Sequence, residues 1–478
     1  MGFKKPGNSK TPCRMCKIQG KRHGNTYYYP HTEYNTGKLP MRKKVRRCIV
    51  DVVAARSEEI SKETGIVSES IFLELDSLHF PRSFPVDIMH CVLQNITPTL
   101  FKLWNGTKLP IDLGKETTDR SIDPEWPSYV IHNNQLAAIG AALNKAKARI
   151  PAYLGHAPRR IERHYRGFKA AEWSAWLTMY ALPLITNLLD DVYVRNFRDL
   201  SQLYILATQN ELDATEITMI GDLARDFVHL FEECYYRCED ERLPMLGINI
   251  HSLLHMEQHI RDCGPAWCFW QFPMERFAGV VKPLAKSKSQ LSRSLSNALA
   301  VIEQLNNVQF TRSNDNQPAP ECPRLVTPAI GAKFRNARSN LLRQLHALPH
   351  QTSIDTTAIF LRCELRPGMF IGSKLQTRTG ISRMNYTVCY QEDDGSPIRF
   401  AEVEFFVEVG NAGNWAMIRE CRNPPGIDVG RRLAYYDSRA ARRTRWINVA
   451  WIKSLVGELM GLSNQRTVYC VTDFGLFD

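Results

Sequence analysis

The 478-residue sequence lacks several features that would place it in a membrane or in a secretory pathway. It has no run of about 18 apolar residues, which argues against a membrane-spanning helix. No apolar stretch follows Met1 and the lysines next to it, which argues against a signal peptide. The thirteen cysteines are odd in number and scattered, so they favour free or metal-bound thiols over a disulfide framework.

Acidic residues are nearly absent from residues 1–50, which hold thirteen Lys or Arg and a single acid, Glu33. This segment alone accounts for the formal net charge of +12, and the rest of the chain is neutral. A second basic stretch, residues 431–445, has six arginines and one acid. Such clusters favour a polyanionic partner, although a solvated arm is the alternative. The residues predicted to contact nucleic-acid phosphates are Arg42, Lys43, Lys44, Arg46, Arg47, Arg442 and Arg443. Residues 41–47 also fit a nuclear localisation signal, so the nucleus is the expected compartment.

Hydrophobic periodicity predicts a mainly α chain followed by a small β domain. Apolar residues recur with helical spacing over 84–104, 130–150, 170–186, 193–209, 213–238, 248–260, 272–285 and 289–306, and a short polar helix is expected at 56–66. A proline-rich linker at 311–325 precedes a short basic helix at 331–347. Beyond residue 360 the period changes to two, which predicts strands at 386–391, 400–407, 415–418 and 467–471, with a hairpin around Asp393. A helix near 449–459 is expected to close this domain.

Cys13 and Cys16 form a CxxC pair, which can place two thiolates on one side of a tight loop. A tetrahedral zinc ion needs a second pair of ligands, and His23 and His31 are the nearest histidines in the sequence. Structural free thiols are the alternative. No βαβ pattern follows the motif, which disfavours a redox role.

His251, His255 and His259 are spaced to share one face of the predicted helix at 248–260. Two imidazoles one turn apart can bind one metal ion, whereas buried, hydrogen-bonded histidines are the alternative. No HExxH pattern accompanies them, which argues against a zinc protease. Glu275 begins a predicted helix after an aromatic stretch, where it is either a metal ligand or a partner of the helix dipole. Glu172 is a similar but weaker candidate.

Four segments together, and in this order, resemble CACTA-like DDE transposases, notably those of fungi. They are Cys13-Arg-Met-Cys16 with Tyr27-Tyr-Tyr-Pro30 (CR-x-C…YYP), Phe84-Pro-Val-Asp-Ile-Met-His90 (FP-x-D-x-MH), residues 172–184 (EW…YSLPLL) and residues 249–276 (NIH-x-LLH…GP-x-W-x-FW-x-FP-x-ER). The similarity covers residues 1–310, and four ordered motifs are far more specific than any one of them.

The resemblance implies a partial ribonuclease H-like core interrupted by a large helical insertion domain. The expected units are a basic N-terminal segment with part of the core (1–83), the insertion (84–271), core helices (272–310), a linker (311–350) and a β-rich domain (351–478). The family's chemistry is two-metal phosphoryl transfer, in which two aspartates and one glutamate hold two Mg²⁺ ions.

Residue by residue, the resemblance implies that Glu275 is the third catalytic carboxylate. It implies that Asp87 and His90 open the insertion and join His251 and His255 at a zinc site, with Cys91 or His259 as substitutes. In distant relatives, including the V(D)J recombinase, a comparable zinc site precedes the catalytic glutamate. The two catalytic aspartates are expected upstream of Met1, because Asp51 and Asp76 lack the family's context.

The expected function is that of a transposase-derived protein, the C-terminal part of a DDE transposase. It is expected to be catalytically incomplete on its own but able to bind DNA. Transposon ends are the expected partner, with a homo-oligomer as a further expectation, and Mg²⁺ is required only by a complete active site. The alternative is a non-enzymatic, zinc-stabilised scaffold or chromatin-associated protein of transposon origin.

Overall fold

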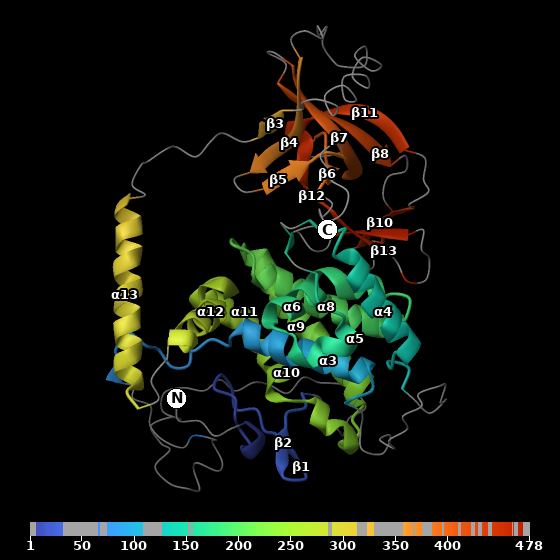
Figure 1. The fold of residues 1–478 in the computed structure, drawn as a ribbon. Helices are drawn as coiled ribbons and strands as arrows, with labels where there is room; N and C mark the ends of the chain where they lie inside the picture. The colour runs from blue at the N-terminus through green and yellow to red at the C-terminus, as the bar shows by residue number, and fades with distance from the viewer. Residues whose placement is uncertain are drawn as a thin grey trace.

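A computed structural model of the protein places a β-rich domain above a helical body (Figure 1). It describes residues 6–31, 66, 74–108, 127–151, 154–155, 157–284, 289–312, 323–328 and, with short gaps, 357–471. The basic cluster at 42–47, the predicted helix at 331–347 and nearly all of that at 56–66 lie outside these residues. Among the described helices, none is both long and apolar enough to cross a bilayer.

The helical body contains the largest hydrophobic core of the described residues. Its helices are η3 (Met89–Ile96), α3 (Thr97–Trp104), α4 (Asn133–Ala146), α5 (Ile161–His164), η6 (Tyr165–Gly167), α6 (Ala170–Ala175), η7 (Trp176–Tyr180), α7 (Ala181–Ile185), α8 (Asp191–Ala207), α9 (Ala214–Phe231), η8 (Glu232–Tyr236), η9 (Asp240–Met245), α10 (Ile248–Ser252), η10 (Leu253–His255) and α11 (Met256–Cys263). The helices predicted from periodicity between residues 84 and 260 are thus confirmed. The short α5 and η6 were not predicted, because elements of about one turn are too short to display a helical period.

Aromatic side chains fill the centre of this core. The indole N–H of Trp104 donates to the hydroxyl of Tyr235 at 3.0 Å, and both side chains are fully buried. The Trp104 ring also lies 5.1 Å from that of Phe197. A buried indole N–H without a partner would cost about 1–3 kcal/mol, so this hydrogen bond fixes how α3 packs on η8.

Helices α12 (Phe272–Val281), η12 (Lys282–Leu284) and α13 (Leu291–Arg312) follow the helical body. In Figure 1, α13 stands at the edge of the molecule. No residue of α12 is buried, and the large exposed apolar side chains of the two longer helices are Met274, Phe277, Val280, Leu291 and Val301. These helices confirm the periodicity over 272–285 and 289–306 but contribute little to the core.

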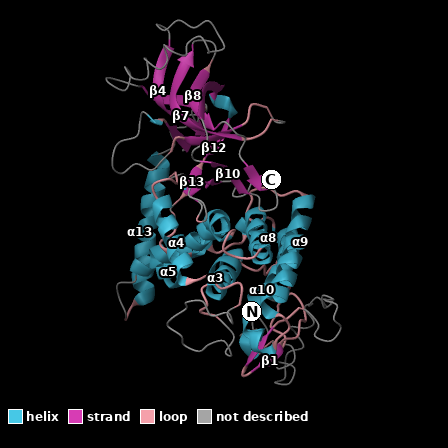
Figure 2. Ribbon diagram, turned by 90° about the vertical axis from the view of Figure 1, so that its right-hand side faces the viewer, coloured by secondary structure: helices cyan, strands magenta, loops and turns pink. Residues whose placement is uncertain are grey.

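The β-rich domain consists of two antiparallel sheets (Figure 2). The larger, curled sheet contains β3 (Arg324–Pro328), β4 (Thr357–Arg366), β5 (Met369–Gly372), β6 (Thr387–Tyr390), β7 (Arg399–Val409), β8 (Asn414–Cys421), β11 (Arg442–Asn448) and β12 (Ile452–Leu455). The smaller has the order β13 (Gly457–Met460), β14 (Thr467–Val471), β10 (Leu433–Asp437) and β9 (Gly426–Asp428). The predicted hairpin around Asp393 is confirmed, since β6 and β7 pair with Tyr390 opposite Arg399.

The helix expected at 449–459 was wrong. A short 3-10 turn at Val449–Trp451 leads instead into β12 and β13. Ile452, Ser454 and Leu455 of β12 are buried while Lys453 is exposed, and Leu455 pairs with Val388 of β6. The apolar residues that suggested a helix therefore satisfy a sheet, whose partner strand lies far away in the sequence.

Strand β13 also joins the β-rich domain to the helical body. The guanidinium of Arg149, which follows α4, lies 3.3 Å from the carboxylate of Glu458, whose other oxygen accepts from Thr387 at 3.2 Å. Leu459 belongs to the core of the helical body rather than to that of the sheet. Gly457 lies close to Ile150: a Cβ atom added at Gly457 would come within 2.5 Å of the Cδ1 atom of Ile150. The two units are therefore packed together at this strand.

Candidate metal centre

The N-terminal segment forms a small cap against the helical body. It contains η1 (Pro6–Asn8) and the hairpin of β1 (Lys21–His23) and β2 (Thr26–Tyr28). Its own apolar cluster is formed by Cys13, Met15, Cys16, Ile18 and Tyr29. Between η1 and β1, the amide N–H of Met15 donates to the Cys13 sulfur at 3.4 Å. Both thiols of this loop are buried, in keeping with the prediction that the CxxC spacing places them on one side.

His251 and His255 lie one turn apart on α10 and η10, on the face that meets this loop. The Nε2 atom of His255 is 3.4 Å from the Cys13 sulfur, and that of His251 is 3.3 Å from the Cys16 sulfur. The two Nε2 atoms are 3.2 Å apart. All four residues are buried, and their ligand atoms lie within 4.8 Å of one another. We call Cys13, Cys16, His251 and His255 the Cys–His cluster.

These separations suit a metal ion such as zinc. A tetrahedral zinc with Zn–S bonds of about 2.3 Å and Zn–N bonds of about 2.0 Å separates its ligand atoms by about 3.3–3.8 Å. Two imidazole nitrogens that face each other at 3.2 Å cannot both carry a proton on the shared side, so at least one offers a lone pair. Two thiols and two imidazoles form one of the commonest structural zinc ligand sets.

The thiol chemistry of the cluster favours metal binding. The hydrogen bond with Cys16, together with His251 and His255, holds the pKa of Cys13 well below its usual range, against the opposing effect of burial. The thiolate is the form that binds metals. A buried thiol whose pKa is lowered by two imidazoles and a second thiol is therefore suited to coordinate a cation.

Three further contacts fasten the N-terminal segment beside the cluster. The guanidinium of Arg14 donates to the carbonyl of Pro85 at 2.5 Å, and the amide of Tyr29 donates to the carbonyl of Leu246 at 2.9 Å. The amide of His31 donates to the Glu232 carboxylate at 2.5 Å. The His31 ring packs edge-on against His251 at 6.1 Å, so it supports the cluster without belonging to it.

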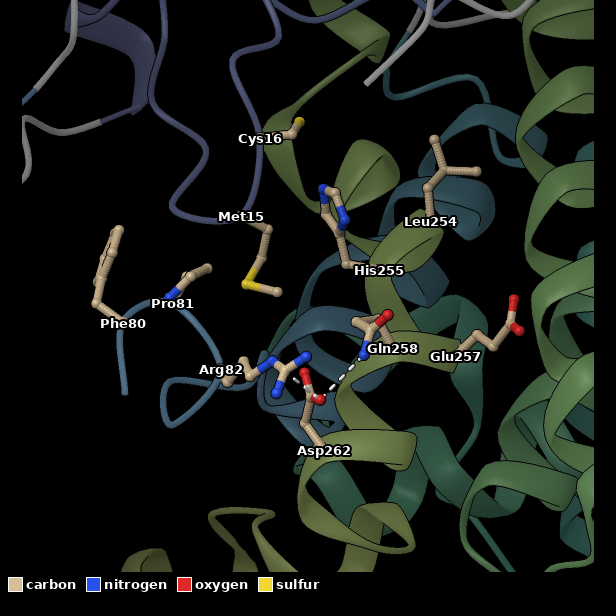
Figure 3. Close-up of a pocket in the computed structure, with 10 residues that line it drawn as sticks. All are labelled: Met15, Cys16, Phe80, Pro81, Arg82, Leu254, His255, Glu257, Gln258 and Asp262. Atoms are coloured by element: carbon tan, nitrogen blue, oxygen red, sulfur yellow. Dashed lines mark hydrogen bonds and ion pairs between the residues drawn. The ribbon is translucent and has the colours of Figure 1, made fainter. Parts of the chain in front are cut away.

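A pocket of about 460 Å³ opens beside the cluster (Figure 3). Cys16 and His255 form part of its wall, and Met15 and Leu254 line it as well. Figure 3 shows Arg82, Gln258 and Asp262 grouped at one end of the pocket. There Asp262 accepts from Gln258 at 3.0 Å and lies 3.6 Å from Arg82. The pocket therefore borders two of the four residues of the cluster.

Asp87 and His90 correct the expected ligand set, because neither belongs to the cluster. One oxygen of Asp87 accepts from the amide of Gln271 at 2.9 Å. The other accepts from the amide of His90 at 2.9 Å and also contacts Nδ1 of that ring. The far side of the ring, Nε2, lies 3.7 Å from the carboxylate of Glu275. Asp87 and His90 therefore contact α12 and the residue before it, Gln271. The ligands that complete the site with His251 and His255 are the thiols of Cys13 and Cys16.

The two proposed substitute ligands, Cys91 and His259, also lie outside the cluster. The Cys91 thiol donates to the carbonyl of Asn249 at 3.4 Å, and burial raises its pKa to about 12. The His259 ring accepts from the amide of Val86 at 3.3 Å, and burial lowers its pKa to about 3. Because each of the two side chains has a structural partner outside the cluster, the four-ligand set is unchanged.

Other predicted site residues have separate surroundings. Arg442 contacts Glu402 in the curled sheet, so its charge is compensated, whereas Arg443 is exposed on the same strand. Glu172 forms two contacts of 2.7 Å with Arg159, which makes it a structural anchor of α6. Glu275 is more than half exposed.

Sequence reasoning identified both halves of the Cys–His cluster but did not pair them. Cys13 and His255 are 242 positions apart, a separation that no local spacing bridges. Comparison of the chain with models of known protein families, with curated proteins and with solved structures gives no match.

Proposed function

We propose that this is a transposase-derived protein that binds DNA and whose N-terminal segment is fastened by a structural zinc ion. The observation that carries the proposal is the buried Cys–His cluster in the sequence order of the family resemblance. Its last ligand, His255, stands 20 residues before Glu275, where a zinc site is expected to precede the catalytic glutamate.

The zinc ion would be held by Cys13, Cys16, His251 and His255. It would cross-link the N-terminal segment to helices α10 and η10, and it would carry no reaction. The fit rests on the ligand separations of 3.2–3.4 Å and on the burial of all four residues.

Glu275 and α12 support the transposase part of the proposal. In the resemblance, this glutamate stands on a late helix of a ribonuclease H-like core. The apolar side chains exposed on α12 and α13 suit helices that belong to such a core rather than to the insertion. We therefore include a ribonuclease H-like origin of these two helices in the proposal.

DNA binding rather than DNA cleavage is the activity that we propose for the described residues. Among them, the Cys–His cluster is the one group of three or more side chains placed to hold a metal ion. Two-metal catalysis needs several carboxylate oxygens around each Mg²⁺ ion. Glu275 instead has the imidazole of His90 as its neighbour, at 3.7 Å.

Binding to a fluorescent DNA duplex, measured by anisotropy over a range of salt, tests the proposal. We expect an affinity that falls steeply with salt, because phosphate contacts release counterions. Absence of binding at low salt would contradict the proposed DNA binding and leave the alternative function, a zinc-stabilised scaffold. The attachment of the N-terminal segment to the helical body through the cluster favours this alternative. Magnesium-dependent nicking that Glu275→Ala abolishes would show cleavage and contradict the proposed restriction to binding.

A further inference from the structure

A basic surface lies where helix α3 ends. Lys102 is in the last turn of α3, and Lys108 follows the turn after it. The ring of Tyr165, at the start of η6, packs 5.2 Å from that of Phe101 and so brings Arg166 to the same region. We name this surface, formed by Lys102, Lys108, Arg163, Tyr165 and Arg166, the α3–η6 patch.

The positive charges of this patch are mostly not compensated. The neighbouring Arg159 forms an ion pair with Glu172 at 2.7 Å, and Arg160 forms one with Glu162 at 2.6 Å. Arg163 shares Glu162 at a longer 3.7 Å. Within the part of the chain that the structure describes, no carboxylate comes within ion-pair distance of Lys102, Lys108 or Arg166. An excess of cations therefore remains on this surface.

The turn after α3 holds the two lysines together. The amide of Lys108 donates to the carbonyl of Lys102 at 3.0 Å. Thr107 donates through its hydroxyl to the side chain of Asn105 at 2.6 Å, which closes the turn. Burial, and then the charge of Lys102, lower the pKa of Lys108 to about 8. The charge of Lys102 thus acts on the Lys108 ammonium, and an anion bound at both lysines would offset that repulsion.

An aromatic ring accompanies the charges. The guanidinium of Arg166 lies 5.7 Å from the centre of the Tyr165 ring and donates to its hydroxyl at 3.2 Å. Burial alone would raise the pKa of Tyr165, but hydrogen bonds from Thr107, Arg166 and Asn105 bring it below its usual range. A planar cation fixed against a tyrosine suits the recognition of phosphates, and the ring suits contact with sugars or bases.

We propose that the α3–η6 patch contacts the phosphodiester backbone of duplex DNA. The inference rests on the proposed function and adds to it the surface that makes the contact. An anionic membrane is the less suitable partner, because basic surfaces that bind membranes firmly also present exposed apolar anchors. None of the large exposed apolar side chains among the described residues lies in 97–108 or 157–169.

The test uses the zinc-loaded full chain and a fluorescent duplex of about 30 base pairs in about 50–200 mM salt. In the variant Lys102→Gln/Lys108→Gln/Arg166→Gln, we expect the slope of log affinity against log salt to fall by about 2–3, since each phosphate that is no longer neutralised removes about 0.9. Affinity should fall by roughly tenfold or more at the lower salt. The matched control removes three exposed charges from separate helices, Lys145→Gln/Arg195→Gln/Arg293→Gln, and should leave the slope unchanged.

The outcomes separate the two proposals. Equal slopes for the patch variant and the control, in a chain that binds DNA, overturn the patch and leave the proposed function standing. A chain that binds no DNA at low salt overturns both. A patch variant that loses binding to phosphatidylserine vesicles but keeps its DNA affinity assigns the surface to membranes instead. If the triple variant unfolds at a lower temperature than the wild type, Lys102→Gln/Arg166→Gln, which spares the half-buried Lys108, gives the same readings.

Discussion

Replacing Cys16 by serine tests the metal centre most directly, because the thiol is buried and lies 3.3 Å from its histidine partner. A serine hydroxyl is not a zinc ligand at neutral pH, so the substitution leaves three ligands in place of four. Structural zinc sites contribute about 10–16 kcal/mol of apparent binding free energy when all ligands are present. We expect the zinc content to fall from about one ion per chain toward zero after dialysis against a mild chelator.

The structural effect of the loss should be local to the N-terminal segment. Met15, Ile18 and Tyr29 are the larger apolar side chains of its small core, and each contributes about 1.5–3 kcal/mol through burial. Their combined contribution is smaller than that of the metal. Without zinc, residues 6–31 should therefore open, while the core of the helical body stays folded. Limited trypsin digestion should then cut faster after Lys10, Lys17 or Lys21, because the backbone around these lysines would no longer be held in the folded conformation.

Cys268→Ser is the matched control, since Cys268 is a free and exposed cysteine outside the cluster. It should keep its zinc and its resistance to trypsin. Cobalt offers a second reading, because thiolate-to-cobalt absorption should weaken in Cys16→Ser and remain in Cys268→Ser. Equal zinc content in the two variants, or digestion that is insensitive to chelator in the wild type, would refute the assignment of the cluster as a metal centre.

Contacts elsewhere in the molecule support three other predictions. Asp87→Asn should weaken the hydrogen bond that Asp87 accepts from the Gln271 amide at the start of α12. A hydrogen bond to a charged group contributes about 1.5–3 kcal/mol, and other contacts share this role, so amide hydrogen exchange around Glu275 should become faster by roughly tenfold. Unchanged exchange would contradict this prediction. Arg442 and Lys374 hold the pKa of Glu402 below its usual range despite burial, so its stabilisation is complete above about pH 4.5 and is lost as pH falls through the lower folded value. Glu402→Gln should therefore destabilise the β-rich domain by about 1.5–3 kcal/mol at pH 7 in denaturant titrations, and hardly at all near pH 2. Gly457→Val should loosen β13 from the helical body by about 1–3 kcal/mol, and Ile150→Ala should restore part of the loss if the clash is the cause.

The helices of the body were predictable because their apolar residues repeat with helical spacing, a signal that lies within each segment. The helix expected at 449–459 shows the limit of that reasoning. Its apolar residues fit a helix or a strand equally well, and the choice depends on Val388 and its neighbours in β6. The hairpin around Asp393 needed no distant partner and was predicted correctly.

The candidate site shows the same division. The CxxC pair and the two histidines were each recognised as half of a metal site from local spacing. Joining them required the tertiary fold, which brings Cys13 to His255 across 242 positions. Asp87 and His90 were assigned to the metal because the family resemblance implies it. In the structure they contact the Gln271 amide and Glu275, at the start of α12. Local sequence patterns predict this helix but not its position in space beside Asp87 and His90.

The contact between β13 and the helical body has a topological consequence. The β-rich domain is joined to that body twice, once through the polypeptide after α13 and once through Arg149, Glu458 and Leu459. The chain thus closes a large ring, in which the covalent connection keeps the docking surfaces at a high effective concentration. A single proteolytic cut between α13 and β4 would open the ring without separating its parts. Release of the domain would require both the cut and the loss of the β13 contact.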